Sequence, residues 1–164
     1  GVSTTRPAAE GVTEDFTNRG GGSGEGLGAA MEAALKRKRR VVGYYWGPSG
    51  LRGAYDLVKL EETPFDASGW AELKASDSPK RATAYPTSKV VIGANVDLAK
   101  KAPQLASFFK SYGTTSDVTS KMLAEAREKG VTPEQQALVF LKTQGDIWKK
   151  WLPADAAGKV AAGL

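Results

Sequence analysis

The sequence contains no cysteine and no histidine. Without cysteine the chain can form no disulfide, no thiolate nucleophile and no cysteine metal site. Without histidine it lacks the usual general base near neutral pH and the commonest metal ligand. A hydrolase triad and a zinc centre are both disfavoured by these absences. We therefore predict a protein that is not an enzyme, with no catalytic residue, no metal site and no cofactor.

Long apolar runs are missing as well. No stretch of about 18 apolar residues occurs, which is the length that a membrane-spanning helix needs. The 164 residues are 41% hydrophobic and 25% charged, which is typical of globular domains. A chain of this length can bury a core and suits one domain or two small lobes.

Positive charge is concentrated in one place. The formal net charge is +5, and Lys36–Arg40 is a run of five basic residues, so the rest of the chain is neutral overall. One interpretation is a small basic interaction module that binds nucleic acid or an anionic surface. The other is a solvated helix end, where cations complement the helix dipole. No aromatic residues interleave with the run for base stacking, so we expect no nucleic-acid partner.

The predicted organisation is an irregular N-terminal segment over residues 1–22, followed by an α/β unit over residues 23–164. β-Prone runs predict strands at 41–46, 55–60 and 90–94. The polar stretch 61–80 is expected to be irregular, with Phe65 and Trp70 as anchors. Helices are predicted at 27–40, 103–112, 116–129 and 132–151, with a short turn at 96–101 and a weak helical turn near the C-terminus.

The later helices have clear end signals. Pro103 suits the first turn of its helix, and Gly130 suits the residue that ends the next one. Thr132-Pro133-Glu134-Gln135 combines an N-cap, a first-turn proline and a capping-box glutamine in register. Trp148 and Trp151, three residues apart on one helix face, are most simply core or lobe-contact residues.

The most informative segment is Val41 to Pro48, Val-Val-Gly-Tyr-Tyr-Trp-Gly-Pro. Pro48 cannot continue a sheet ladder, so the predicted strand delivers Trp46 to its carboxyl end, where open α/β sheets place ligands. Alternation puts Tyr44 and Trp46 on one face. The segment is either part of an aromatic box for a quaternary ammonium group or ordinary core packing.

A glycine-rich stretch precedes the first predicted helix. Gly24-x-Gly26-x-x-Ala29 satisfies a loose dinucleotide fingerprint, but no apolar strand precedes it, and no Gly-Lys-Ser/Thr follows. We interpret it instead as a flexible connection or a loop whose backbone donors face a ligand. Ser23 and Gly24 are the candidate polar donors there.

Taken in order, several segments resemble the C-terminal half of substrate-binding proteins of glycine betaine/proline-type ABC importers. Tyr-Tyr-Trp-x-Pro, ending at Pro48, is the most specific of them. The similar segments are Gly22-Ser23 with the helix that follows, Val41 to Pro48, Tyr55 to Glu62, Tyr85 to Asn95, Ala102 to Phe109 and Thr132 to Leu152.

The resemblance implies a type II periplasmic-binding-protein-like α/β fold, here incomplete, and a protein that is periplasmic or extracellular, either free or associated with the membrane. It implies uptake of betaine-like osmoprotectants, with a small zwitterionic or cationic ligand and a membrane permease as partners. In that family the Trp corresponding to Trp46 is one wall of an aromatic cage, with Tyr44 as a neighbour. The family's N-terminal half supplies further cage aromatics, so a complementary lobe or a second copy is a further expected partner.

Overall fold

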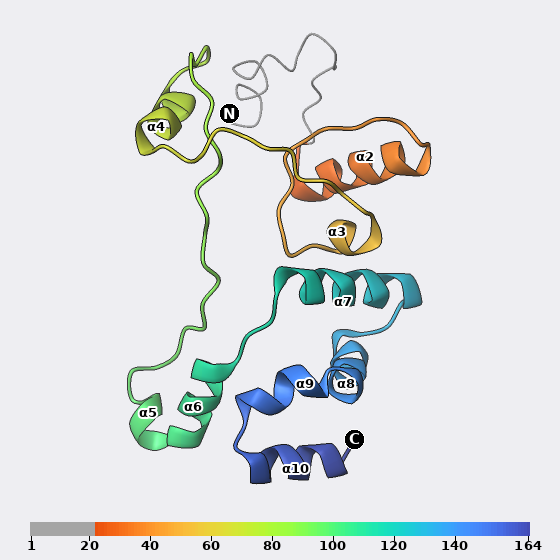
Figure 1. The fold of residues 1–164 in the computed structure, drawn as a ribbon, viewed down its shortest axis with the longest axis vertical. Helices are drawn as coiled ribbons and strands as arrows, with labels where there is room; N and C mark the ends of the chain where they lie inside the picture. The colour runs from red at the N-terminus through yellow and green to blue at the C-terminus, as the bar shows by residue number, and fades with distance from the viewer. Residues whose placement is uncertain (1–21) are drawn as a thin grey trace. The chain divides into compact units, whose positions relative to one another are not determined.

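The computed structural model describes residues 22–164, and every regular element in that range is a helix (Figure 1). Except for Gly22, the irregular segment expected over residues 1–22 lies outside the described residues. The elements in chain order are α2 (Gly24–Lys36), α3 (Gly50–Ala54), α4 (Ala67–Ala75), α5 (Leu98–Lys101), α6 (Pro103–Ser111), α7 (Ser116–Lys129), α8 (Pro133–Thr143), α9 (Gly145–Trp148), the 3-10 helix η1 (Lys149–Trp151) and α10 (Ala154–Ala162).

The predicted α/β fold class is wrong for this part of the chain. Between residues 22 and 164 there is no β-strand, and the expected strands at 41–46, 55–60 and 90–94 are single stretches without a ladder. One isolated backbone bond, from Ala84 N–H to the Thr63 carbonyl (2.8 Å), links two extended segments.

The missing sheet has a simple physical reason. β-Propensity describes how well a side chain fits a pleated, half-buried surface, and it forms no strand without a partner ladder. The valines of the predicted strands stay in water instead: Val58 is 81% exposed and Val90 is 92% exposed. The sequence pattern therefore identified extended segments but not their pairing.

The chain divides into two compact units, which are described separately. Unit 1 contains residues 22–45 and 58–89 of the described range, with α2 and α4. Unit 2 contains residues 46–57 and 90–164, with α3 and all helices from α5 onward. Within residues 22–164, no helix combines the length and the apolar character that crossing a bilayer would need.

In unit 1, the segment after α2 returns along that helix. Met31 is the buried residue of α2, and its sulfur lies near Gly43. The Tyr45 hydroxyl lies so close to Gly28 that a Cβ there would stand only 2.7 Å from the phenolic oxygen. The absence of a side chain at Gly28 therefore lets Tyr45 lie against α2.

Unit 2 is built on an aromatic core near the C-terminus. Phe140, Trp148 and Ala157 are buried, and the Trp148 indole N–H donates to the Leu141 carbonyl (2.7 Å). Trp151 stacks on Phe140, with ring centroids 5.7 Å apart. The sequence-based interpretation of Trp148 as a core residue is confirmed, since only 2% of it is exposed.

The helix ends of unit 2 are largely those that the sequence predicts. Gly130 ends α7 in a left-handed conformation (φ 61°), and Thr132 and Gln135 form the capping box of α8. The single helix expected over residues 132–151 is wrong, however. The backbone of Gln144 (φ −116°, ψ 41°) leaves the helical region, so the stretch divides into α8, α9 and η1.

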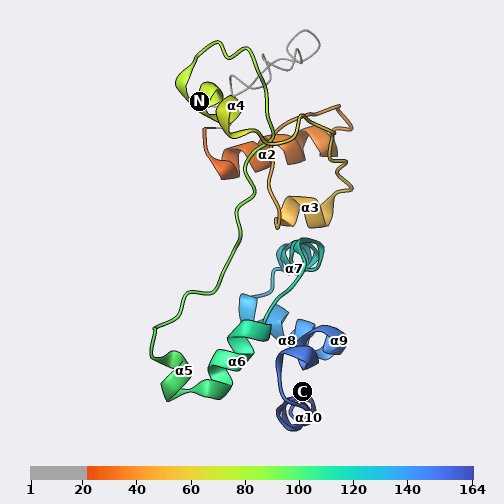
Figure 2. The ribbon, with the colours of Figure 1, turned by 60° about the vertical axis from the view of Figure 1, so that its left-hand side comes forward.

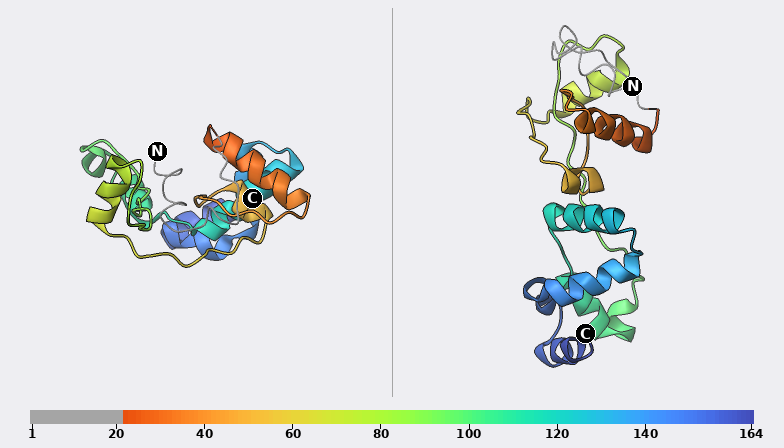
Figure 3. Two further views of the ribbon diagram at one scale, coloured as in Figure 1. Left: turned by 90° about the horizontal axis from the view of Figure 1, so that it is seen from above. Right: turned by 90° about the vertical axis from the view of Figure 1, so that its right-hand side faces the viewer.

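The most extensive helix contact in unit 2 joins α3 to α7 (Figures 2 and 3). The backbone N–H of Ser49 donates to the buried hydroxyl of Ser120 (3.0 Å). Gly53 faces the α7 backbone, and a Cβ at this position would collide with the Ser120 carbonyl and approach the Ala124 methyl. The contact therefore requires glycine at residue 53.

We expect Gly53→Ala to destabilise unit 2 by about 1–3 kcal/mol, because the added methyl meets backbone that cannot rotate away. Urea unfolding followed by near-UV circular dichroism, which reports the buried Trp148, measures the change.

Gly158→Ala in α10 is the matched control, since nothing lies within 4 Å of its Cβ position. That substitution should stabilise by about 0.5–1 kcal/mol through helix propensity. Equal unfolding midpoints for Gly53→Ala and the unaltered protein would contradict the α3–α7 packing.

Candidate functional site

Three aromatic rings meet in unit 1, and we call them the aromatic triplet: Tyr44, Trp70 and Tyr85. The Tyr44 and Tyr85 rings stack with centroids 4.2 Å apart and an interplanar angle of 30°. Trp70 meets Tyr85 edge to face, with centroids 5.1 Å apart at 62°. Offset-stacked and edge-to-face pairs are the arrangements that aromatic quadrupoles favour. The triplet is therefore a well-formed aromatic cluster.

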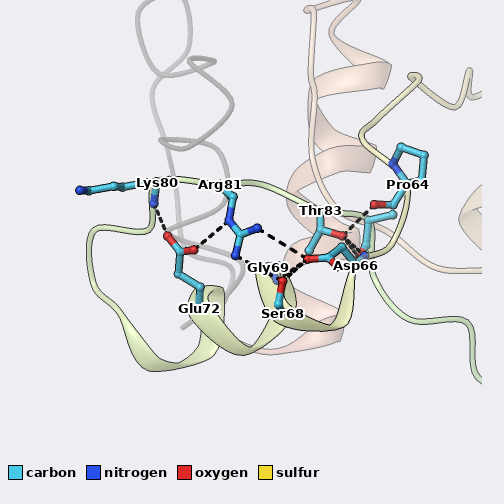
Figure 4. A network of polar contacts seen from close by, with 9 residues as sticks. Pro64, Asp66, Ser68, Gly69, Glu72, Lys80, Arg81 and Thr83 are labelled. Atoms are coloured by element: carbon cyan, nitrogen blue, oxygen red, sulfur yellow. Dashed lines mark hydrogen bonds and ion pairs between the residues drawn. The ribbon is translucent and has the colours of Figure 1, made fainter.

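Trp70 belongs to α4, whose first turn is fixed by a polar network (Figure 4). The Asp66 carboxylate caps the helix by accepting from the Gly69 N–H and the Ser68 hydroxyl, both at 2.6 Å. Thr83, which is buried, accepts from the Asp66 N–H (2.7 Å) and donates to the Pro64 carbonyl (3.0 Å). The cap therefore joins α4 to the extended segment that leads to Tyr85.

A second set of contacts holds the far end of α4. The Glu72 carboxylate accepts from the backbone N–H of Lys80 (2.7 Å) and from Arg81 Nε (3.1 Å). Arg81 also approaches the Asp66 carboxylate at 3.9 Å and donates to the Ser68 hydroxyl at 3.3 Å. Figure 4 shows Arg81 between the two carboxylates. Both ends of α4 are thus tied to residues 80–83.

These contacts lower the pKa of both carboxyls. The hydrogen bond from the Ser68 hydroxyl is the main cause for Asp66, followed by that from the Gly69 N–H. For Glu72 the backbone N–H of Lys80 is the main cause of the lowered pKa, followed by Arg81. Hydrogen bonds to the charged form favour it, so both groups are carboxylates at neutral pH.

The triplet offers aromatic surface to a ligand. Tyr44 is 40% exposed, and Trp70 and Tyr85 are partly buried. Aromatic ring faces attract cations, most strongly when the cation is poorly hydrated. The arrangement can therefore hold a methylated ammonium group.

The predicted site residues fall in three places. Tyr44 is part of the triplet. Ser23 and Gly24 begin α2, where the Ser23 hydroxyl accepts from the Gly26 N–H (3.0 Å) as the N-cap. Trp46 belongs to unit 2 and is 43% exposed. The expectation that Tyr44 and Trp46 share one face rested on strand alternation, and residues 41–46 form no strand.

The Ser23 hydroxyl also contacts the Glu25 side chain. The pKa of Glu25 is lowered, mainly by the backbone N–H of Glu25 itself and then by the Ser23 hydroxyl. Ser23 therefore has a structural role at the start of α2. Because the Ser23 hydroxyl already bonds to Gly26 and Glu25, it is a poor candidate for a hydrogen-bond donor to a ligand.

Sequence reasoning missed two members of the triplet, Trp70 and Tyr85. The stretch 61–80 was expected to be irregular, but α4 lies within it. The available signal was Asp66, a good N-cap residue placed three residues before Gly69. Tyr85 precedes Pro86, which favours an extended backbone, yet nothing in the sequence says that this segment lies beside Tyr44.

The two best-formed hollows lie away from the predicted aromatics. One, of about 340 Å³ in unit 1, is lined by Lys59, Leu60, Glu61, Glu62, Pro64 and Ala84. The other, of about 390 Å³ in unit 2, is lined by Lys149, Leu152, Ala154, Ala157, Gly158 and Ala161. Both are shallow and open, and neither contains a ring. The triplet suits a methylated cation better than either hollow, because aromatic ring faces attract such a cation and neither hollow is lined by an aromatic side chain.

Acidification should loosen α4. Because the pKa values of Asp66 and Glu72 are lowered in the folded protein, their contribution to stability is present above the ordinary carboxyl values, about 4. It is lost as the pH falls through the folded values. With 5-fluorotryptophan incorporated, the ¹⁹F resonance of Trp70 should shift as the pH falls from about 6 to about 3.

Glu72→Gln should reduce the acid-induced shift, because one of the two titrating carboxyls is removed. The Trp148 resonance in unit 2 is the internal control, and Trp70→Phe assigns the Trp70 signal. A Trp70 resonance that moves only together with that of Trp148 would indicate global unfolding and would contradict the role of this network.

Comparison with known protein families identifies a match for this chain. Residues 4–143 match the family model for the substrate binding domain of ABC-type glycine betaine transport systems. No curated protein and no solved structure matches the chain. The matched range covers most of the sequence and includes the aromatic triplet, Trp46 and the start of α2. The chain therefore belongs to the family of substrate-binding domains of ABC-type glycine betaine transport systems.

Proposed function

We propose that this chain is an extracytoplasmic substrate-binding component of an ABC importer and that it takes betaine-like quaternary ammonium compounds. Glycine betaine, proline betaine, choline or a relative is the ligand, and a membrane permease receives it. Family membership supports the substrate-binding role, and the family is extracytoplasmic and non-enzymatic in general. The observation that carries the ligand class is the aromatic triplet. The exposed indole of Trp46 follows Tyr44 by two residues in the sequence.

Ligand chemistry supports aromatic recognition. A trimethylammonium group carries a permanent charge, but its methyl groups donate no strong hydrogen bond. Ring faces attract such a cation by about 0.5–2 kcal/mol for each well-placed ring. Tyr44 and Trp46 are the residues that we propose to supply these faces, and the stack on Tyr85 orients the ring of Tyr44.

The carboxylate of a betaine needs donors as well. Gly24 and Ser23 stand at the start of α2, where backbone N–H groups lack partners within the helix. Because the Ser23 hydroxyl is engaged as the cap, we assign the donor role to backbone N–H groups there. The positive end of a helix dipole favours an anion.

Enclosure of the ligand is the remaining requirement. Small-molecule sites bury most of the ligand surface, whereas Tyr44 and Trp46 are both open to water. We therefore propose that a complementary lobe or a second copy closes over the ligand. This partner would supply the remaining cage walls.

Tryptophan fluorescence titrated with glycine betaine tests the proposal. Trp46→Ala should weaken binding roughly two- to thirtyfold, which corresponds to one lost cation–π contact. Tyr44→Ala should weaken it by a similar factor. Trp70→Ala should have a smaller effect, because Trp70 contacts Tyr85 and is not one of the two rings that we assign to the ligand.

Glycine serves as the ligand control, since it has the same carboxylate but a well-hydrated ammonium group. Glycine binding as tightly as glycine betaine would overturn aromatic recognition. Equal losses in Trp46→Ala and Trp70→Ala would reject Trp46 as a cage wall. Circular dichroism spectra of all variants check that the helices remain intact.

A further inference from the structure

The basic run Lys36–Arg40, which we call the basic block, lies on the surface of the protein. All five residues are exposed. Lys36 pairs with Glu32 at 2.9 Å, whereas Arg37 to Arg40 form no ion pair with any residue from 22 to 164. The formal charge of the basic block, +5, is equal to the net charge of the whole chain.

The backbone of the basic block is shaped by an unusual helix end. Lys38 has a left-handed conformation (φ 55°), a position that glycine usually occupies after a helix. Its N–H donates to the Leu35 carbonyl and the Arg39 N–H donates to the Ala34 carbonyl, both at 2.9 Å. Lysine adopts this conformation at a cost in stability. The sequence thus keeps a positive charge where glycine would fit better.

Apolar surface follows the charges directly. Val41 and Val42 come next in the chain, and Val42 is 48% exposed. The surface therefore joins five cations to an exposed aliphatic side chain. Basic charge next to aliphatic surface suits the boundary between lipid headgroups and acyl chains.

We infer that the basic block binds the surface of an anionic phospholipid membrane. Polybasic segments are attracted to anionic lipids by a roughly additive contribution from each Lys or Arg, within about a Debye length of the surface. Nucleic acid, the other polyanion, fits less well, because no aromatic residue lies within the block to stack on a base. The inference does not depend on which ligand the aromatic residues hold.

Such binding has a consequence for a transport component. A binding protein held at the membrane surface meets its permease by diffusion in two dimensions. The attraction is also reversible, since it weakens with salt. The basic block would therefore raise the local concentration of the chain at the membrane without anchoring it permanently.

Sedimentation with large unilamellar vesicles tests the inference on the full chain. Vesicles of phosphatidylcholine mixed with phosphatidylglycerol should bind the protein at about 0.1 M salt and release it at about 1 M salt, where screening is nearly complete. Vesicles of phosphatidylcholine alone should not bind it. Millimolar inorganic phosphate should not displace the protein, because one phosphate ion interacts with fewer basic residues than an extended surface of lipid headgroups does.

Replacing all five residues of the basic block by Gln should reduce vesicle binding on the order of a hundredfold or more. The matched control removes five exposed charges from unit 2 and leaves the block intact. It carries Gln at Lys100, Lys110, Lys121, Lys129 and Lys142. Equal losses in the two variants would show that binding follows net charge alone and would overturn the inference.

Lys38→Gly separates binding from folding. Glycine adopts the left-handed conformation of residue 38 at a lower cost than lysine, so the melting temperature should rise. The affinity for anionic vesicles should fall about fivefold, because one positive charge is lost. Unchanged affinity would contradict the inference. Tighter binding to a mixed-sequence oligonucleotide than to the anionic vesicles, lost in the block variant, would assign the surface to nucleic acid instead.

Discussion

Each regular element between residues 22 and 164 is a helix, which pairs its interior backbone groups within itself and leaves those at its ends to find other partners. A peptide group outside a helix must find another partner or remain in water. Side chains at the starts of the helices therefore stabilise much of the local structure by accepting hydrogen bonds from the first-turn N–H groups. Five helices begin with a side-chain N-cap: Ser23, Ser49, Asp66, Thr115 and Thr132. Two of these caps also reach across the sequence, because the N–H groups of Ser49 and Asp66 donate to Ser120 and Thr83.

How much the sequence predicts depends on how local the controlling interaction is. The Thr132–Gln135 capping box and the end of α7 at Gly130 involve neighbours in the chain, and both are confirmed. Strand pairing involves distant segments, and the α/β prediction failed there because residues 41–46 and 90–94 find no ladder among the described residues. The same limit applies to the candidate site. Tyr44 was singled out, but its contacts to Tyr85 and Trp70 link segments that no periodicity relates.

The two surfaces that we assign to function use different physics. The aromatic triplet is an uncharged surface, suited to a cation that hydrogen bonds cannot recognise. The basic block is a cluster of hydrated charges, suited to an extended anionic surface and sensitive to salt. In the sequence, only residues 41–43 separate the basic block from Tyr44, one member of the triplet. One short stretch of chain therefore joins the residues that we propose to bind a membrane to a ring that we propose to bind the ligand.

The unpaired stretch 86–94 has a consequence for how the chain can be cut. Proteases take their substrates in extended form, and this stretch is already extended, with Lys89 exposed in its middle. Cleavage by trypsin after Lys89 would leave α3 covalently attached to the N-terminal fragment, although α3 packs on α7 of the other fragment. The two fragments would then be held together by the close approach of Gly53 to Ser120, so a nicked protein could remain assembled after its chain had been broken.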